Sequence, residues 1–243
     1  MNTNKRTARI VGVLFIAATV VSILGTLIFL GPPLDDPDYL VNVSANENQV
    51  VIGVLLEIIA AGAVAGTGIT LFPIFKKHNE ALALGYAAGR TVEGVFIIVS
   101  AIGALLLLTL SREYVAGAPD ASHFQTLGTV LRAERDWSFL VGPNLVFSLN
   151  ALMLSYMLYR SRLVPRWLSV WGLVGAPLIL AATLLRVFGV ITLFSPIAAL
   201  LALPIAVFEM VLAVRLIVKG FNSSAIASES ARTAISEAAA VPG

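Results

Sequence analysis

Five ionisable residues lie within long apolar stretches of this sequence, where charge is costly: Glu57, Arg90, Glu93, Arg186 and Glu209. At the centre of a membrane helix such a side chain costs about 2.5–3.5 kcal/mol, so five unpaired ones would cost roughly 12–17 kcal/mol. They therefore need partners, water or a shallow position. Because arginine keeps its proton, three carboxylates facing two arginines leave one glutamate that can be protonated, as a proton-coupled carrier requires.

The depth of these residues in the predicted helices groups them into two clusters. Neighbouring spans run in opposite directions, so the charges of the third and sixth spans fall at one level and those of the second and fifth at another. In the third span, Tyr86, Arg90 and Glu93 share one helix face through their spacing of three and four residues. We therefore expect a substrate-binding cavity lined by Tyr86, Arg90, Glu93, Glu209 and Asn144, and a secondary buried charge pair formed by Glu57 and Arg186.

The elements that carry these residues are predicted to be membrane-spanning helices. The chain is 58% hydrophobic and only 12% charged, whereas soluble domains carry about 25% charged residues. A helix needs about 20 mainly apolar residues to cross the bilayer. The first apolar run is longer than the 7–15 residues usual in a signal peptide, which favours an uncleaved span. The sequence predicts an all-α, polytopic fold with six spans at 9–31, 49–75, 82–110, 138–159, 165–190 and 196–219.

The distribution of lysine and arginine predicts the orientation of these spans. Cytoplasmic connections are enriched in Lys and Arg. The basic residues cluster at the N-terminus, in the second and fourth connections and at the C-terminal end, whereas acidic residues outnumber basic ones in the first and third connections. Both termini are therefore expected in the cytoplasm, in the inner (plasma) membrane of the cell.

The outer connection between the third and fourth spans has a helical pattern of its own. Phe124, Leu127 and Leu131 recur at helical spacing between Ser111 and Trp137. This predicts a short amphipathic helix in the membrane interface, which serves either as a surface connector or as a lid over an outward cavity.

Small residues within the spans predict where helices approach closely. Gly62 and Gly66 lie four residues apart in the second span, and Gly94 lies in the third. Inside lipid, such residues allow backbones to pack tightly. We expect these contacts within the monomer, in preference to a dimer.

The remaining segments are a cytoplasmic tail at 1–8, a membrane domain at 9–219 and a disordered, Ser/Ala-rich tail at 220–243. The expected partner is the lipid bilayer, and protein partners are not indicated. Anionic headgroups are expected to contact the basic turn between the fourth and fifth spans, which contains Arg160, Arg162 and Arg166.

Composition argues against several kinds of chemistry. The chain has no cysteine and two histidines, so no metal site, cofactor or catalytic residue is predicted. A net charge of +2 gives no reason to expect nucleic acid. The leading interpretation is a proton- or ion-coupled small-molecule transporter, and an enzyme is disfavoured. The alternative is a structural, sensory or stress-related membrane protein whose buried charges only clamp the helices.

Three stretches of the sequence resemble a known family. They are Asn46-Glu47-Asn48-Gln49 followed by Leu56-Glu57, Gly85-Tyr86 followed by Arg90 and Glu93-Gly94, and the run from Leu163 to Gly172. Together they resemble the bacterial membrane family catalogued as domain of unknown function 4386, over nearly the whole chain except the C-terminal tail. The resemblance implies a bacterial multi-span protein and brings no activity, ligand or catalytic residue.

Overall fold

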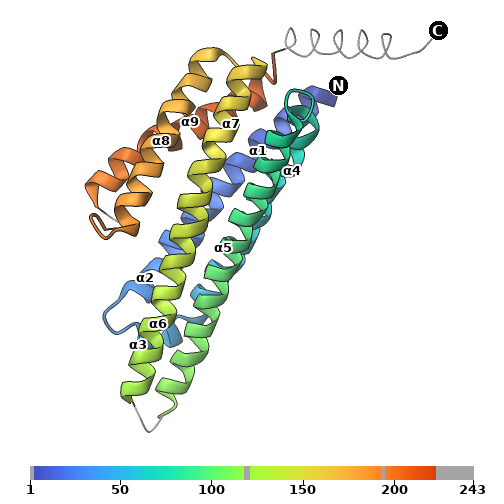
Figure 1. Cartoon of the computed structure of the whole chain (residues 1–243). Coiled ribbons are helices and arrows are strands. Elements are labelled where there is room, and N and C mark those ends of the chain that lie inside the picture. The colour runs from blue at the N-terminus through green and yellow to red at the C-terminus, as the bar shows by residue number, and fades with distance from the viewer. Residues whose placement is uncertain (1–2, 118–120, 193–194, 223–243) are drawn as a thin grey trace, which may run out of the picture. The chain divides into compact units, whose positions relative to one another are not determined.

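The computed structural model describes residues 3–117, 121–192 and 195–222, and within these ranges the chain is helical with no strand (Figure 1). Residues 223–243 of the predicted disordered tail lie outside the described residues. Six helical stretches in the described ranges are long and apolar enough to cross a membrane: Asn4–Asp35, Glu47–Phe75, Glu80–Val115, Ser122–Ser161, Arg166–Val187 and Pro196–Val218. The predicted all-α fold with six transmembrane helices is therefore confirmed.

These stretches are built from the following elements: α1 (Thr3–Ile23), a π-helix η1 (Leu24–Leu30), α2 (Gly31–Asp35), α3 (Tyr39–Ala45), α4 (Glu47–Phe75), α5 (Glu80–Val115), α6 (Ala121–Phe139), a second π-helix η2 (Leu140–Val146), α7 (Phe147–Ser161), α8 (Arg166–Val187) and α9 (Pro196–Val218). The chain divides into two compact units, and several helices contribute to both. The first unit contains Met1–Phe15, Thr67–Gly89 and Ser148–Gly243, and the second contains Ile16–Gly66 and Arg90–Phe147.

The connection between the first two spans packs onto the core of the second unit. The short helices α2 and α3 bury Leu34, Leu40 and Val43 beside Val54 of α4 and Leu107 of α5. The hydroxyl of Ser111 donates to the carbonyl of Leu40. This connection is therefore folded and largely helical, because its apolar side chains remove surface from water when the chain turns back.

The predicted interfacial helix is part of a longer element. Residues Ala121–Phe139 are helical, but the helix continues without a break through η2 and α7, so that Ser122–Ser161 is one stretch of 40 residues. Pro143 lies inside this stretch without ending it. Arg135, which the sequence placed in the outer connection, is consequently carried into the interior of the second unit with an exposed fraction of 9%.

In the first unit, α8 and α9 lie side by side (Figure 1). A Cβ at Gly175 of α8 would come within 3.0 Å of the backbone nitrogen of Ile205 on α9, so the glycine permits close approach. Ser195 begins α9 by accepting a hydrogen bond from the backbone N–H of Ala198 at 3.1 Å, while Pro196 suits the first turn.

Asn222 ties the end of α9 to the turn before α8. Its side-chain amide donates to the carbonyl of Arg162 at 2.7 Å, and its carbonyl oxygen accepts from Arg215 at 2.7 Å. Arg162 has a φ of 56°, a left-handed conformation that the surrounding contacts must hold. Replacing Asn222 by alanine is therefore expected to lower the free energy of unfolding by about 1–2 kcal/mol.

The measurement is a thermal melt of the detergent-solubilised protein. Asn46→Ala is the control, because its side chain bonds the nearby carbonyl of Asn42 at an exposed site. Equal losses for the two variants would contradict a special role for Asn222.

Candidate functional site

A buried ion pair in the second unit joins Glu57 on α4 and Arg135 on α6. Arg135 donates to one Glu57 oxygen at 2.6 Å and to the other at 3.0 Å. Glu57 is 2% exposed. Two parallel hydrogen bonds between an arginine and a carboxylate are stronger than hydrogen bonds between neutral groups, and they offset the cost of burying both charges.

Two further groups complete this network. The hydroxyl of Thr26 in η1 donates to Glu57 at 3.0 Å, and Arg135 also donates to the backbone carbonyl of Ser100 on α5 at 2.9 Å. The network therefore joins segments of the first, second, third and fourth spans. Bonds that cross between so many helices fix their register.

Sequence reasoning missed Arg135 as a partner of Glu57. It placed Arg135 in the outer connection, before a fourth span expected at 138–159, whereas one helical stretch runs from Ser122 to Ser161. The signal in the sequence was the helical spacing of Phe124, Leu127 and Leu131, which continues in register to Arg135 and Ser138. Arg186, the partner expected from depth, lies on α8 in the first unit, and its pairing with Glu57 stays a prediction.

The second ion pair joins Arg90 and Glu93 within α5. One guanidinium nitrogen of Arg90 donates to both carboxylate oxygens of Glu93, at 3.1 and 3.0 Å. The two residues are 3% and 4% exposed. The guanidinium also lies 5.7 Å from the ring centroid of Phe147, within cation–π range. Because this salt bridge spans three residues of one helix, it does not by itself hold two helices together.

The π-helix η2 packs against this pair. A Cβ at Gly142 would clash with Phe96 and would lie 3.4 Å from the backbone oxygen of Glu93. Pro143 has no N–H to donate to the carbonyl of Phe139 four residues earlier. The side-chain amide of Asn144 donates to that carbonyl at 3.0 Å. The side chain of Asn144 thus supplies a donor to the backbone beside the proline, and π-helical segments of this kind frequently mark functional sites.

The other predicted site residues lie in the first unit. Tyr86 is fully buried, and its ring packs edge-on against Phe75 with centroids 6.0 Å apart. Glu209 lies on α9. The expected cavity that would bring Tyr86 and Glu209 together with Arg90 involves both units and stays a prediction.

Glu134 is a further carboxylate that sequence reasoning left in the outer connection. One of its oxygens accepts from Ser138 at 2.7 Å. The other is buried over Gly103 and has no hydrogen-bond partner among the described residues. Among those residues no group of three or more His, Cys, Asp and Glu side chains is placed to hold a metal ion.

The fold and its buried ion pairs define an all-helical, multi-pass membrane protein. The family model described as domain of unknown function (DUF4386) matches residues 10–220, so the chain belongs to this family. Comparison with curated proteins and with solved structures gave no match.

Proposed function

We propose that this protein is a proton- or ion-coupled carrier of small anionic molecules in the inner (plasma) membrane, with both termini in the cytoplasm. Arg90 holds the anionic group of the substrate, and Glu93 exchanges a proton. Tyr86, Glu209 and Asn144 belong to the same proposed substrate site. The observation that carries this proposal is a deeply buried salt bridge formed within one helix.

The chemistry follows from the position of that bridge. An arginine in the membrane keeps its charge and must have an anionic partner. A substrate carboxylate or phosphate can take the place of Glu93 on the guanidinium, and Glu93, once released into an apolar interior, then takes up a proton. Loss of the substrate reverses both steps. Binding of the anion and uptake of the proton are thereby coupled.

The adjacent π-helix supplies an element that can move. In η2 the hydrogen-bond register is wider than in an α-helix, and the side-chain amide of Asn144 donates to the carbonyl of Phe139 before Pro143. Breaks of this kind let transmembrane helices bend where they line a cavity. A change of register in η2 would shift Gly142 against Phe96 and the backbone of Glu93.

Water access to the Arg90–Glu93 face tests this proposal, and the cysteine-free chain allows single-cysteine labelling without further changes. Ile97 lies one turn from Glu93 and is 7% exposed, whereas Val95 is 52% exposed on a face suited to lipid. A membrane-impermeant methanethiosulfonate is expected to label Ile97→Cys and to leave Val95→Cys unlabelled. An unlabelled Ile97→Cys would mean that the face is closed to water and that no carrier site opens there.

A transport assay completes the test. Proteoliposomes given gradients of small organic anions are expected to take up protons, and Glu93→Gln is expected to abolish this coupling. Glu80→Gln, an exposed acid at the start of the same helix, is the matched control and should leave it unchanged.

The alternative, a structural, sensory or stress-related membrane protein whose charges clamp the helices, is favoured by a different observation. The Glu57–Arg135 network crosses between spans and engages both carboxylate oxygens of Glu57. We assign the clamping role to that pair and the ligand role to Arg90 and Glu93.

We also propose that anionic headgroups contact the turn before α8. Arg160, Arg162 and Arg166 are all exposed there. The neighbouring rings of Trp167 and Trp171 lie 6.4 Å apart, and paired aromatic rings suit the headgroup level of a membrane.

A further inference from the structure

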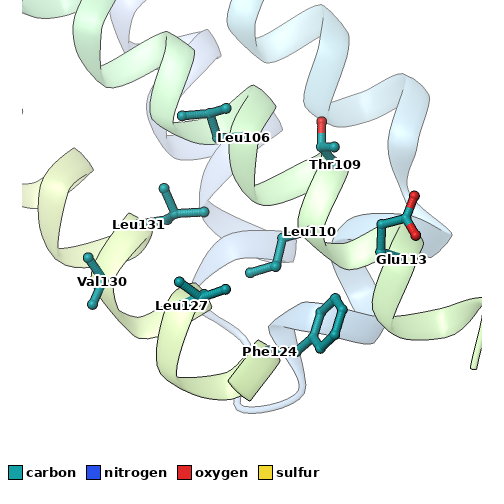
Figure 2. Close-up of a pocket in the computed structure, with 8 residues that line it drawn as sticks. All are labelled: Leu106, Thr109, Leu110, Glu113, Phe124, Leu127, Val130 and Leu131. Carbon is teal, nitrogen blue, oxygen red and sulfur yellow. The ribbon is translucent and has the colours of Figure 1, made fainter. Parts of the chain in front are cut away.

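The two units differ in how their basic residues are neutralised. No basic residue lines the apolar groove between α5 and α6 of the second unit (Figure 2). In the described part of the first unit, lysines and arginines outnumber the acidic residues, which are Glu80 and Glu209. In the second unit, by contrast, every arginine pairs with a carboxylate: Arg90 with Glu93, Arg112 with Glu47, Arg132 with Asp35 and Arg135 with Glu57.

Arg215, in the last turn of α9, holds its charge in a half-buried position. Its guanidinium donates to the side-chain oxygen of Asn222 at 2.7 Å, and its Nε is buried without a hydrogen-bond partner among the described residues. No carboxylate of the described chain forms an ion pair with it. A neutral amide does not cancel the charge, and a partly buried charge without a counter-ion is costly.

Two further basic residues lie at the same corner of the first unit. The chain turns after α9 at Gly220, whose backbone N–H donates to the carbonyl of Arg215 at 3.2 Å. A Cβ at Gly220 would lie 3.7 Å from Cγ of Lys5, so the stem of this lysine on α1 lies against the turn. The side chain of Asn222 also donates to the carbonyl of Arg162. We call Lys5, Arg162 and Arg215 the basic corner.

The end of α9 supplies only part of the missing negative charge. The macrodipole places roughly half a negative elementary charge at a helix C-terminus. Each residue of the basic corner carries a full positive charge, and neither Lys5 nor Arg162 forms an ion pair with a described residue. An anion from outside the described chain is therefore needed.

The basic corner lies where lipid headgroups are expected. The backbone N–H of Asn222 donates to the carbonyl of Leu163 at 2.8 Å, so the end of α9 and the turn before α8 lie at one level. Trp167 in the first turn of α8 and Val218 at the end of α9 are exposed. An exposed tryptophan beside exposed apolar side chains is typical of the boundary between hydrocarbon and headgroups. Lipid phosphates are the anions of that boundary.

We propose that the basic corner binds one anionic phospholipid, whose headgroup phosphate is the counter-ion of Arg215. The guanidinium donates to phosphate oxygens, and the ammonium of Lys5 adds a second attraction. The acyl chains extend along α9 beside Val218. The inference rests on the proposed headgroup contact before α8 and narrows it to a single site. It is independent of transport by Arg90 and Glu93.

Native mass spectrometry of the full chain in detergent measures this binding. Dioleoyl phosphatidylglycerol and dioleoyl phosphatidylcholine share their acyl chains and a phosphate, but only the first has a net negative charge. One phosphatidylglycerol per chain is expected to stay bound, in preference to phosphatidylcholine. Arg215→Gln, which keeps an amide donor for Asn222, is expected to weaken this binding about tenfold. Lys5→Gln is expected to weaken it about fivefold.

The matched control is Lys77→Gln, which removes an exposed lysine of the connection before α5 and should leave lipid binding unchanged. Lys5 is likewise exposed and takes no part in the bonds of Asn222, so Lys5→Gln remains informative if Arg215→Gln fails to fold. Millimolar inorganic phosphate is expected not to displace the lipid, and displacement would show a site for a free anion.

Three results overturn the inference. They are displacement by inorganic phosphate, equal binding of the two lipids, and unaltered binding in both Arg215→Gln and Lys5→Gln. Equal binding of the two lipids also removes the proposed headgroup contact before α8. Unaltered binding in the two variants, with loss in Arg160→Gln combined with Arg166→Gln, removes the basic corner alone and leaves that contact standing.

Discussion

Replacing Arg135 by alanine is expected to lower the free energy of unfolding by about 3–5 kcal/mol. The substitution leaves the carboxylate of Glu57 buried with both of its arginine hydrogen bonds removed. Only the donor hydroxyl of Thr26 remains among the bonds described above. Unfolding in dodecyl sulfate, followed by circular dichroism in mixed micelles, measures this loss.

Two controls show whether the loss belongs to the pair. Arg132→Ala removes a half-buried arginine one turn earlier on α6 that pairs with the exposed Asp35 at 3.8 Å and lies 4.7 Å from the ring centroid of Tyr39, and such weakly paired charges contribute about 0–1 kcal/mol each. The double variant Glu57→Leu with Arg135→Leu removes both charges together, and it is expected to be more stable than Arg135→Ala alone. If the double variant is the least stable, the two residues do not act as one pair.

The pairing of Arg135 with Glu57 shows what could and could not be predicted from the sequence. Five charges within apolar stretches implied that partners must be found inside the bundle, and the structure gives Glu57 such a partner. The identity of that partner depended on where the fourth span begins. Hydropathy falls around Glu134, Arg135 and Asp136, so the sequence placed these residues in the outer connection, yet α6 carries them into the interior of the second unit without a break before η2. Hydropathy treats every charged residue as costly to bury. Because an ion pair offsets that cost, the low hydropathy of a paired residue does not show whether the residue is buried or exposed.

The six spans were predictable for a simpler reason. Each needs only length and an apolar composition, and both can be counted along the chain. The two π-helical segments were not predictable in the same way, although Pro143 marked one of them. The proline removes a donor, but only the packing of Gly142 on Phe96 and the bond from Asn144 decide how the backbone adjusts.

The first outer connection illustrates the limit for short elements. Its prolines and aspartates between Gly31 and Asn48 are typical of a loop. The structure instead forms α2 and α3 there, because Leu40 and Val43 are covered by the ends of α4 and α5. Helices of five to seven residues have no stability of their own and depend on such tertiary contacts.

The sequence also does not show which small residues lie at helix contacts. Gly62 and Gly94 both lie in apolar spans, and nothing in the sequence distinguishes them. A Cβ at Gly94 of α5 would lie 2.9 Å from the carbonyl oxygen of Ala61 on α4, whereas a Cβ at Gly62 would meet nothing within 4 Å. Gly94 is therefore where the second and third spans touch, and the face of α4 that carries Gly62 is uncovered in the monomer. Close contact of this kind is a main source of packing energy inside lipid.

Replacing Gly94 by valine is accordingly expected to lower the free energy of unfolding by about 1–3 kcal/mol, because the added methyl groups force α4 and α5 apart at Ala61. The same substitution at Gly62 is the matched control and is expected to change it by less than about 0.5 kcal/mol. Both are measured in dodecyl sulfate, as for Arg135. If the two variants unfold together, the backbones of α4 and α5 do not meet at Gly94. If Gly62→Val alone is destabilised, α4 packs on another copy of the chain through the Gly62 face.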